Sequence, residues 1–477
     1  MARNLLFLCS DEHARSALGC YGHPVVETPT LDRLAARGVR FTRAYTPSPI
    51  CIPARASIAT GLHVFQHCCW SSAEPYYGQH ESWMHRLRDR GHTVVSIGKL
   101  HFRSGDDDNG FGEEILPMYL ANDGAGWPQA LVRDPLPSFP EAAELAAALG
   151  PGETDYTDYD RKVAAEASRW LRRYPTATRQ SPWALFVSFV SPHYPLVAPP
   201  AFFDRYAKAT IPAPYGRPPD ARSGHAVLQE MRRFWDYDDY FDDDTRLLAR
   251  RSYYGLCSFL DDNIRQVLQA LEDSGQANET LVVYTSDHGE MLGNHGFWTK
   301  SVMYEDSVAV PMVLSGPGVP PGANATPVSL TDLAATIETA VAPGPRPTVA
   351  RWEGRPLQGF IDAPEPDRFV LSEYHDGGSP TGLFMIRHGR WKLVRYAGDH
   401  ADQMFDLEGD PEERADLGES PAHRAQAEIL RGLLDQILDP TEVDRQAKSD
   451  QRRLMEKLGG AETILAMDGF NHTPLPG

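Results

Sequence analysis

Short apolar runs alternate with amphipathic helical stretches along most of this 477-residue chain. Such alternation is typical of a parallel β-sheet whose two faces are covered by helices. Strands are expected at residues 4–9, 39–45, 93–97, 183–189, 280–285 and 308–314. Helices are expected at residues 29–37 and 245–271. We therefore predict an α/β fold with a large, mostly parallel sheet sandwiched between helices.

The chain becomes rich in proline around residues 342–367, which we interpret as a domain boundary. Beyond it the sequence predicts a small antiparallel sheet with a covering helix. The expected elements are a hairpin of residues 384–387 and 391–395, a strand at 402–407 and a helix at 421–438. The predicted division is a catalytic domain (residues 1–365), a C-terminal α+β subdomain (366–438) and a tail (439–477).

The net charge limits the partners that this chain can bind. It has 46 Lys and Arg against 65 Asp and Glu, a formal net charge of −19. Such a charge repels phosphate backbones and anionic lipids, so we expect no nucleic-acid or membrane partner, although a locally basic pocket could hold an anionic substrate. The apolar runs are too short for a membrane span or a signal-peptide core, and we expect a cytoplasmic enzyme. Six cysteines without a Cys-x-x-Cys pair predict neither a disulfide framework nor a zinc site.

An acidic run at residues 236–244 has the composition of a calcium loop. It lacks the central glycine and the terminal glutamate of an EF-hand loop. We interpret it as a solvated loop that precedes the long helix.

Acidic side chains follow two of the predicted strands. Asp11 and Glu12 come after the first strand, and Asp287 and His288 come after the strand at residues 280–285. Ligands of open α/β sheets bind in the crevice outside the carboxyl ends of the strands. Taken alone, the first segment fits a metal ligand or a surface turn equally well, whereas Asp287 is suited to a hard cation.

A cysteine stands where a nucleophile would be activated. Cys51 begins the segment Cys51-Ile52-Pro53-Ala54-Arg55, which leads into a helical stretch that ends at Gly61. A nucleophile at a helix N-terminus meets the positive end of the helix dipole, and Arg55 lies one turn further on. The alternative is a structural cysteine buried at a helix start.

Basic side chains follow two further strands. Lys99 and His101 come after residues 93–97, and their spacing of two on extended backbone points both the same way. His193 follows the strand at residues 183–189, and Lys300 lies downstream of His288. A single histidine at a strand end is more often structural than catalytic. The catalytic interpretation therefore depends on all the segments taken together.

These segments, taken in order over roughly residues 4 to 320, resemble the motifs of the type I, formylglycine-dependent sulfatases of the alkaline-phosphatase superfamily. Residues 51–55 are similar to the family signature, in which Ala is common before the Arg. Residues 98–101 (Gly-Lys-Leu-His) are similar to its Gly-Lys-Trp-His segment, and residues 192–195 to its Pro-His-x-Pro element. His288 replaces a frequent Asn, as in the branch of choline sulfatases and phosphonate monoester hydrolases. The hairpin at residues 389–393 resembles the family's C-terminal domain.

The resemblance implies a sulfate-ester hydrolase in which a formylglycine-generating enzyme converts Cys51 to formylglycine, an aldehyde whose hydrate attacks sulfur. Arg55, Lys99 and Lys300 would face the sulfate oxygens. His193 or Lys300 would protonate the departing oxygen, and His101 would remove the proton that allows sulfate to be expelled.

The same resemblance implies one divalent cation. Asp11, Asp287, His288 and residue 51 would be its ligands, and such a set suits Ca²⁺ best, with Mg²⁺ or Mn²⁺ as alternatives. Where many sulfatases carry a second aspartate, this chain has Glu12. Its longer side chain would either ligate through altered geometry or support the ligands from outside.

Three alternatives remain beside a sulfatase for small aryl or alkyl sulfate esters. The first is a phosphonate monoester or phosphodiester hydrolase of the same fold, against which Lys99 and His101 argue. The second is a metal phosphatase or phosphomutase, which would use Ser or Thr in place of Cys51. The third is an acidic binding protein with an inactive site.

Because the tail at residues 439–477 is apolar in places but weakly periodic, we expect it to contact a neighbouring subunit in a homodimer or homotetramer, or to stay mobile.

Overall fold

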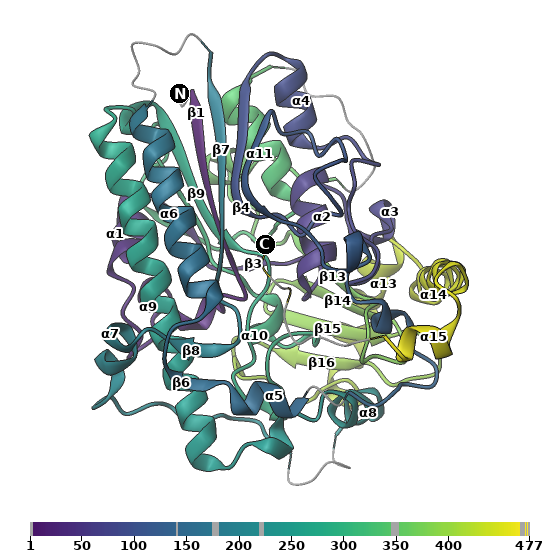
Figure 1. The fold of residues 1–477 in the computed structure, drawn as a ribbon. Coiled ribbons are helices and arrows are strands. Elements are labelled where there is room, and N and C mark those ends of the chain that lie inside the picture. Colours follow the sequence, from purple (N-terminus) through teal and green to yellow (C-terminus); the bar gives the residue numbers. More distant parts are fainter. Residues whose placement is uncertain are drawn as a thin grey trace.

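The computed structural model describes residues 3–139, 142–173, 181–218, 224–344, 353–467, 473 and 475. An eight-stranded sheet in the order β11-β2-β10-β9-β1-β7-β4-β5 runs through the molecule (Figure 1). Only β10 runs antiparallel to its neighbours. The strands are β1 (Asn4–Asp11), β2 (Val39–Phe41), β4 (Thr93–Lys99), β5 (Glu113–Met118), β7 (Trp183–Pro192), β9 (Thr280–Ser286), β10 (Met312–Ser315) and β11 (Gly322–Asn324).

Strand β1 lies at the centre of the sheet, paired in parallel with β7 and β9. All eight of its residues are buried, because helices cover both faces and alternate side chains enter two apolar layers. One layer joins Leu6 and Leu8 to the helices α1 (Pro29–Arg37), α6 (Asp155–Arg173) and α9 (Asp243–Asp273). The other joins Leu5 and Phe7 to α2 (Cys51–Thr60), α4 (Trp83–Asp89) and α11 (Asp332–Val341). The predicted α/β sandwich is confirmed.

Two of the predicted strands were wrong in extent. The run at residues 39–45 divides into β2 and β3 (Ala44–Tyr45), and β3 pairs with β12 (Val328–Ser329) in a separate two-stranded sheet. The run at residues 308–314 begins instead with the end of helix α10 (Glu305–Val308). Pro311, which has no N–H to donate, directly precedes β10, so the regular strand begins only at Met312.

The C-terminal part forms the expected antiparallel sheet in the order β13-β14-β15-β16. Helix α13 (Arg424–Asp435) packs on it through Leu430 and Leu434, which join the apolar cluster of Phe384 and Leu393. The strands are β13 (Phe369–Tyr374), β14 (Leu383–His388), β15 (Trp391–Tyr396) and β16 (Gln403–Asp406). Part of the proline-rich boundary, residues 345–352, lies outside the described residues.

The tail is more regular than its sequence pattern indicated. It contains α14 (Pro440–Lys457) and α15 (Ala461–Leu465), which Figure 1 shows in yellow beside α13. The Trp70 indole donates to Asp450 at 3.0 Å, and Ile464 is fully buried against residues of the catalytic part. These helices therefore pack on their own chain, so the alternative of a mobile tail is wrong for residues 440–467, and its contact with a neighbouring subunit stays a prediction. None of the helices in the described part of the chain combines the length and hydropathy needed to cross a bilayer.

Candidate active site

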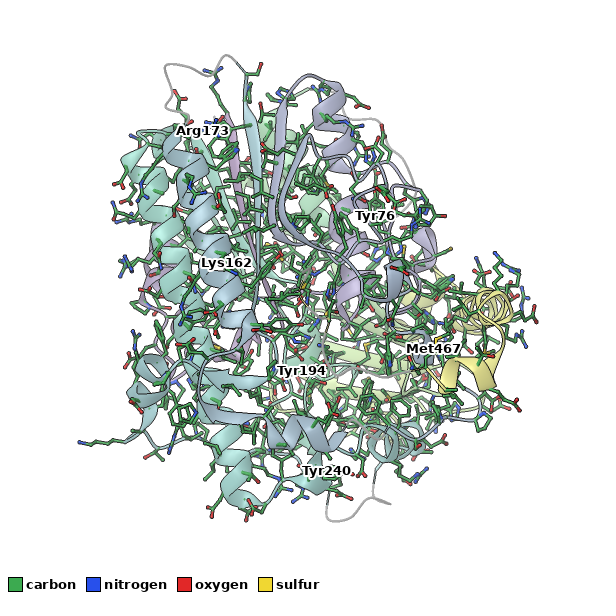
Figure 2. The ribbon with its side chains drawn as sticks, viewed as in Figure 1. Tyr76, Lys162, Arg173, Tyr194, Tyr240 and Met467 are labelled. Carbon is green, nitrogen blue, oxygen red and sulfur yellow. The ribbon has the colours of Figure 1, made fainter. Side chains whose placement is uncertain are left out.

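The carboxyl ends of β1, β4, β7 and β9 meet at one edge of the sheet. They carry Asp11, Lys99, His193 and Asp287, the first three at the end of a strand or just after it and Asp287 directly after β9. All four side chains are buried. In Figure 2, Tyr194, the neighbour of His193, lies well inside the outline of the molecule. The structure thus brings together residues that are separated by up to 276 positions in the sequence.

Four potential metal ligands form one buried group. Single ligand atoms of Asp11, Cys51, Asp287 and His288 all lie within 4.8 Å of one another. The sulfur of Cys51 lies 3.6 Å from Asp11 Oδ1 and 3.1 Å from His288 Nε2. His288 Nδ1 lies 3.0 Å from the carbonyl of Gly289, and a hydrogen bond there leaves Nε2 to face the group with its lone pair. Two carboxylates, one imidazole and the atom carried by residue 51 form a donor set that fits a divalent cation.

Cys51 is the first residue of α2, at the end of the helix that points into the site. Burial and the negative charge of Asp11 raise the pKa of its thiol. At neutral pH an unmodified Cys51 is therefore a protonated thiol, which is a poor nucleophile.

Arg55, one turn along α2, holds the two carboxylates of this group. Its Nε donates to Asp287 Oδ2 at 2.8 Å and its Nη2 to Asp11 Oδ2 at 3.3 Å. Its Nη1 donates to the carbonyl of Lys99 and to the hydroxyl of Ser188. Every nitrogen of this guanidinium thus has a partner within the protein, and it orients the ligands as a rigid fork.

Lys99 and His101 enter the site from the end of β4. The Lys99 ammonium forms an ion pair with Asp11 Oδ2. His101 has a positive φ of 54°, and neither ring nitrogen has a partner within the described residues. Burial and the charge of Lys99 hold the pKa of His101 well below its usual value. His101 is therefore a neutral imidazole that is free to accept a proton.

Lys300 joins His193 and Glu12 opposite the metal-ligand group. Its Nζ lies 2.8 Å from His193 Nε2 and 3.0 Å from Glu12 Oε2. His193 Nδ1 lies 2.7 Å from the carbonyl of Tyr194, so Nε2 is left as the acceptor for Lys300. Burial and the charge of Lys300 lower the pKa of His193. Although burial opposes it, the charge of Glu12 raises the pKa of Lys300 well above its usual value.

Glu12 faces Lys300 rather than the four-ligand group. Its backbone has a φ of 64°, which a non-glycine residue rarely adopts, and its N–H donates to Asp287 Oδ1 at 3.2 Å. With Asp11 and His193 it forms a second, three-member group of potential ligands. Of the two roles left open by the sequence, this placement favours support of the ligands from outside.

A cavity of about 90 Å³ opens onto these side chains. Its lining includes Cys51, Lys99, His101, His193 and Lys300, together with several large aromatic rings. Sequence reasoning missed the aromatic residues, because no motif or spacing marks them. It also missed Thr473, which lines the cavity and accepts a hydrogen bond from the Tyr156 hydroxyl at 2.5 Å.

The acidic run at residues 236–244 contributes no metal-ligand group, since both such groups found among the described residues lie in the active site. It is also less solvated than expected. Asp238 accepts hydrogen bonds from Arg246 and Trp298, and Asp242 caps the N-terminus of α9 by accepting from the backbone of Thr245.

Comparisons with known proteins agree with this geometry. The chain matches the Sulfatase family model over residues 3–341 and the model for the C-terminal region of N-sulphoglucosamine sulphohydrolase over residues 293–441. It is 32% identical to the choline-sulfatase of Rhizobium meliloti (strain 1021) over 413 residues, 83% of this chain and 78% of that protein. It is 30% identical to an uncharacterized sulfatase of Escherichia coli (strain K12) over 457 residues, 92% and 88% of the two chains. A phosphonate monoester hydrolase from Silicibacter pomeroyi shares the fold, with a TM-score of 0.72, 24% identity and coverage of 92% of this chain and 96% of its own.

Proposed function

The chain belongs to the sulfatase family of sulfuric ester hydrolases, and from this membership we propose that it hydrolyses sulfate monoesters of aryl or small alkyl alcohols. The observation that carries the proposal is the convergence of Lys99, His101, His193 and Lys300 on the cavity that Cys51 lines. Two lysines suit an anionic ester, and two neutral imidazoles can accept protons and pass them on.

We propose that Asp11, Asp287, His288 and residue 51 hold one divalent cation, Ca²⁺ before Mg²⁺ or Mn²⁺. We also propose that a formylglycine-generating enzyme converts Cys51. The cation would screen the charge of the ester and acidify the nucleophile, and formylglycine would supply that nucleophile as its hydrate. The position of Cys51 at the start of α2, among the four potential ligands, supports a modified side chain that both attacks the substrate and ligates the cation.

The positively charged side chains have two roles: one holds the carboxylates that would bind the metal, and the others bind the sulfate group of the substrate. Arg55 donates hydrogen bonds to Asp11 and Asp287, and these bonds keep the two carboxylates in place. Lys99 and Lys300 line the cavity, and their ammonium groups attract and orient the sulfate oxygens. This refines the expectation from the sequence, in which Arg55 also faced the sulfate.

Proton transfer falls to the Lys300–His193 pair and to His101. A proton of Lys300 is directed at His193 Nε2, so the pair can deliver one proton to the departing alcohol oxygen from either member. His101 lines the same cavity as a neutral base, and it would take the proton whose loss lets inorganic sulfate leave. His193 and Lys300 thus act as the acid, and His101 acts as the base.

The test is a panel of esters presented to protein produced together with a formylglycine-generating enzyme. Mass spectrometry of the peptide that contains residue 51 should detect formylglycine, and 4-nitrophenyl sulfate should be hydrolysed. Converted, metal-loaded protein that hydrolyses no sulfate ester would contradict the proposal. Converted protein that prefers phosphorus esters would support the second candidate, a phosphonate monoester or phosphodiester hydrolase, which His288 favours and Lys99 with His101 disfavours.

We further propose that the protein is a homodimer or a dimer of dimers with the tail at the interface. The support is the pair of exposed apolar side chains at the end of α15, Leu465 (45% exposed) and Met467 (37% exposed). Large apolar side chains that are exposed side by side are typical of contact surfaces between subunits.

A further inference from the structure

Four aromatic side chains form one wall of the active-site cavity, and no step of the proposed reaction uses them. We call Trp127, Phe139, Trp235 and Tyr237 the aromatic wall. Phe139 lies at its centre, with its ring centroid 5.7 Å from that of Trp127, 5.2 Å from Trp235 and 6.0 Å from Tyr237. Trp127 and Trp235 lie 5.9 Å apart. The wall is therefore one packed surface, although its members come from separate parts of the sequence.

Two positively charged side chains and two histidines line the cavity. They are Lys99 and Lys300, with the titratable His101 and His193, and no carboxylate of the described residues lines the cavity. Asp376 lies one hydrogen bond behind the lining, where it accepts from the Ser72 hydroxyl. Asp376 itself does not line the cavity. The described lining of the cavity thus offers a cation no opposite charge.

The arrangement of the rings also disfavours a cation. Phe139 meets Trp127, Trp235 and Tyr237 edge to face, with interplanar angles of 76°, 73° and 88°. In an edge-to-face pair, the edge of one ring covers the face of the other. Because a cation binds to an open ring face, these pairs leave it less surface than an open cage would.

A sugar would place several hydroxyl groups against the aromatic wall. Apart from the catalytic side chains, the polar groups of the lining are hydroxyls and the indole N–H groups of Trp127 and Trp235, and the hydroxyl of Ser72 already donates to Asp376. Sugar hydroxyls placed against the rings would lose their hydrogen bonds to water without replacement. An uncharged ring or branched alkyl group loses none, and aromatic pairs gain from offset or edge-to-face contact.

We propose that the aromatic wall binds the alcohol part of the substrate and selects an uncharged aromatic or branched alkyl group over a quaternary ammonium or a sugar. This inference rests on the proposed sulfatase function, whose substrate class it narrows.

The first experiment compares esters that differ in the alcohol alone. 3,3-Dimethylbutyl sulfate and choline sulfate have the same shape, with carbon in one where the other has charged nitrogen, and benzyl sulfate and glucosamine 6-sulfate complete the set. We expect kcat/KM for the two uncharged apolar esters to exceed that for choline sulfate and the sugar ester by about tenfold or more. A preference for choline sulfate or the sugar ester would overturn the inference and leave the sulfatase function intact.

The second experiment removes parts of the wall. Trp235→Ala and Trp127→Ala should each lower kcat/KM for benzyl sulfate by roughly tenfold or more, while the inhibition constant of inorganic sulfate stays unchanged. Tyr240→Ala, an aromatic side chain that is 47% exposed, is the matched control and should change neither value. Equal losses on all four esters would overturn the inference. If an alanine variant fails to fold, Trp235→Phe should give a smaller loss in the same direction.

A binding measurement separates this inference from the proposed function. Calorimetry of the wild-type protein should detect benzyl alcohol but not choline, and Trp235→Ala should weaken the binding of benzyl alcohol. This result is expected even if no sulfate ester is hydrolysed, in which case the proposed function alone would fail. Choline binding with no benzyl alcohol binding would overturn the inference.

Discussion

The sulfur of Cys51 lies 3.1 Å from Nε2 of His288, although 237 positions separate the two residues. Cys51 begins helix α2, and His288 comes just after the end of strand β9. The two residues meet because the fold brings both to the edge of the sheet where its parallel strands end. An atom at this position can attack a substrate and ligate a metal at once. The proposed mechanism depends on this double role.

Removal of the side chain of residue 51 should therefore abolish turnover. Cys51→Ala is expected to keep less than about a tenth of the wild-type kcat/KM on 4-nitrophenyl sulfate, with an unchanged circular dichroism spectrum. Cys20→Ala, at a half-buried cysteine outside the site, is the control and should keep full activity. Higher residual activity in Cys51→Ala would place the nucleophile elsewhere.

Loss of one carboxylate should remove the metal. Asp287→Asn keeps the size of the side chain but removes the charge that Arg55 holds at 2.8 Å, so we expect loss of bound metal and of activity together. Elemental analysis of the purified variant checks this, with the exposed Asp273→Asn as control. Full metal occupancy in Asp287→Asn would refute the proposed ligand set.

Sulfate esters should be better substrates than phosphorus esters. The comparison is kcat/KM on 4-nitrophenyl sulfate against a 4-nitrophenyl phosphonate ester. Because Lys99 and His101 are expected to act on the sulfate oxygens and on product release, His101→Ala should lower sulfate turnover by about a hundredfold. A wild-type ratio in favour of the phosphonate would assign the enzyme to the alternative activity.

One buried carboxyl group should contribute less to stability as the pH rises from about 5 to about 8. Burial raises the pKa of Glu373 from 4.5 to about 8, so the folded protein keeps a proton there that the unfolded chain has lost. The stabilisation from this proton is complete below pH 4.5 and is lost as the pH rises through 8, at no more than about 1.4 kcal/mol per pH unit.

Glu373→Gln isolates this effect, because the amide oxygen can still accept the hydrogen bond from Phe65 N. The free energy of unfolding of the variant, relative to that of the wild type, should increase from about pH 5 to about pH 8. Denaturant unfolding at both pH values measures it. A constant difference would mean that Glu373 is already ionised in the folded protein, paired with His375, whose Nε2 lies 3.5 Å away.

The oligomer should depend on the exposed end of the tail. The double variant Leu465→Asp/Met467→Asp is expected to reduce the mass measured by light scattering, since a charge would be buried at each contact. Ile429→Asp, at a 54% exposed position on α13, is the matched control. An unchanged mass in the double variant would place the interface elsewhere.

The sequence predicted the site better than its surroundings, for physical reasons. Asp11 and Asp287 could be found because parallel strands deliver the residues that follow them to one edge of the sheet. Lys300 lies in irregular backbone after β9, so only its family motif marked it. Trp127 and Phe139 had no such marker, since their meeting with Trp235 depends on the packing of loops that local pattern does not encode.

The same limit explains the errors in the fold. The apolar run at residues 308–314 contains Pro311, yet the sequence pattern alone did not show that α10 would occupy its first residue. The tail had too few apolar residues for a strong helical period. Its helix α14 is held in part by polar contacts to distant residues, such as the ion pair of Arg133 with Asp444 at 3.6 Å. Such contacts produce no periodic pattern of apolar residues in the sequence.

The burial of Cys51 determines when, relative to folding, this residue can be modified. Only 6% of the residue is exposed, and every residue of the helix that it begins is buried. A modifying enzyme must bind the chain around residue 51, and in the folded protein this segment is buried. Conversion would therefore have to precede folding, during or soon after synthesis. Protein that folds first would be trapped with its thiol, and a modifying enzyme added later could rescue only chains that unfold again.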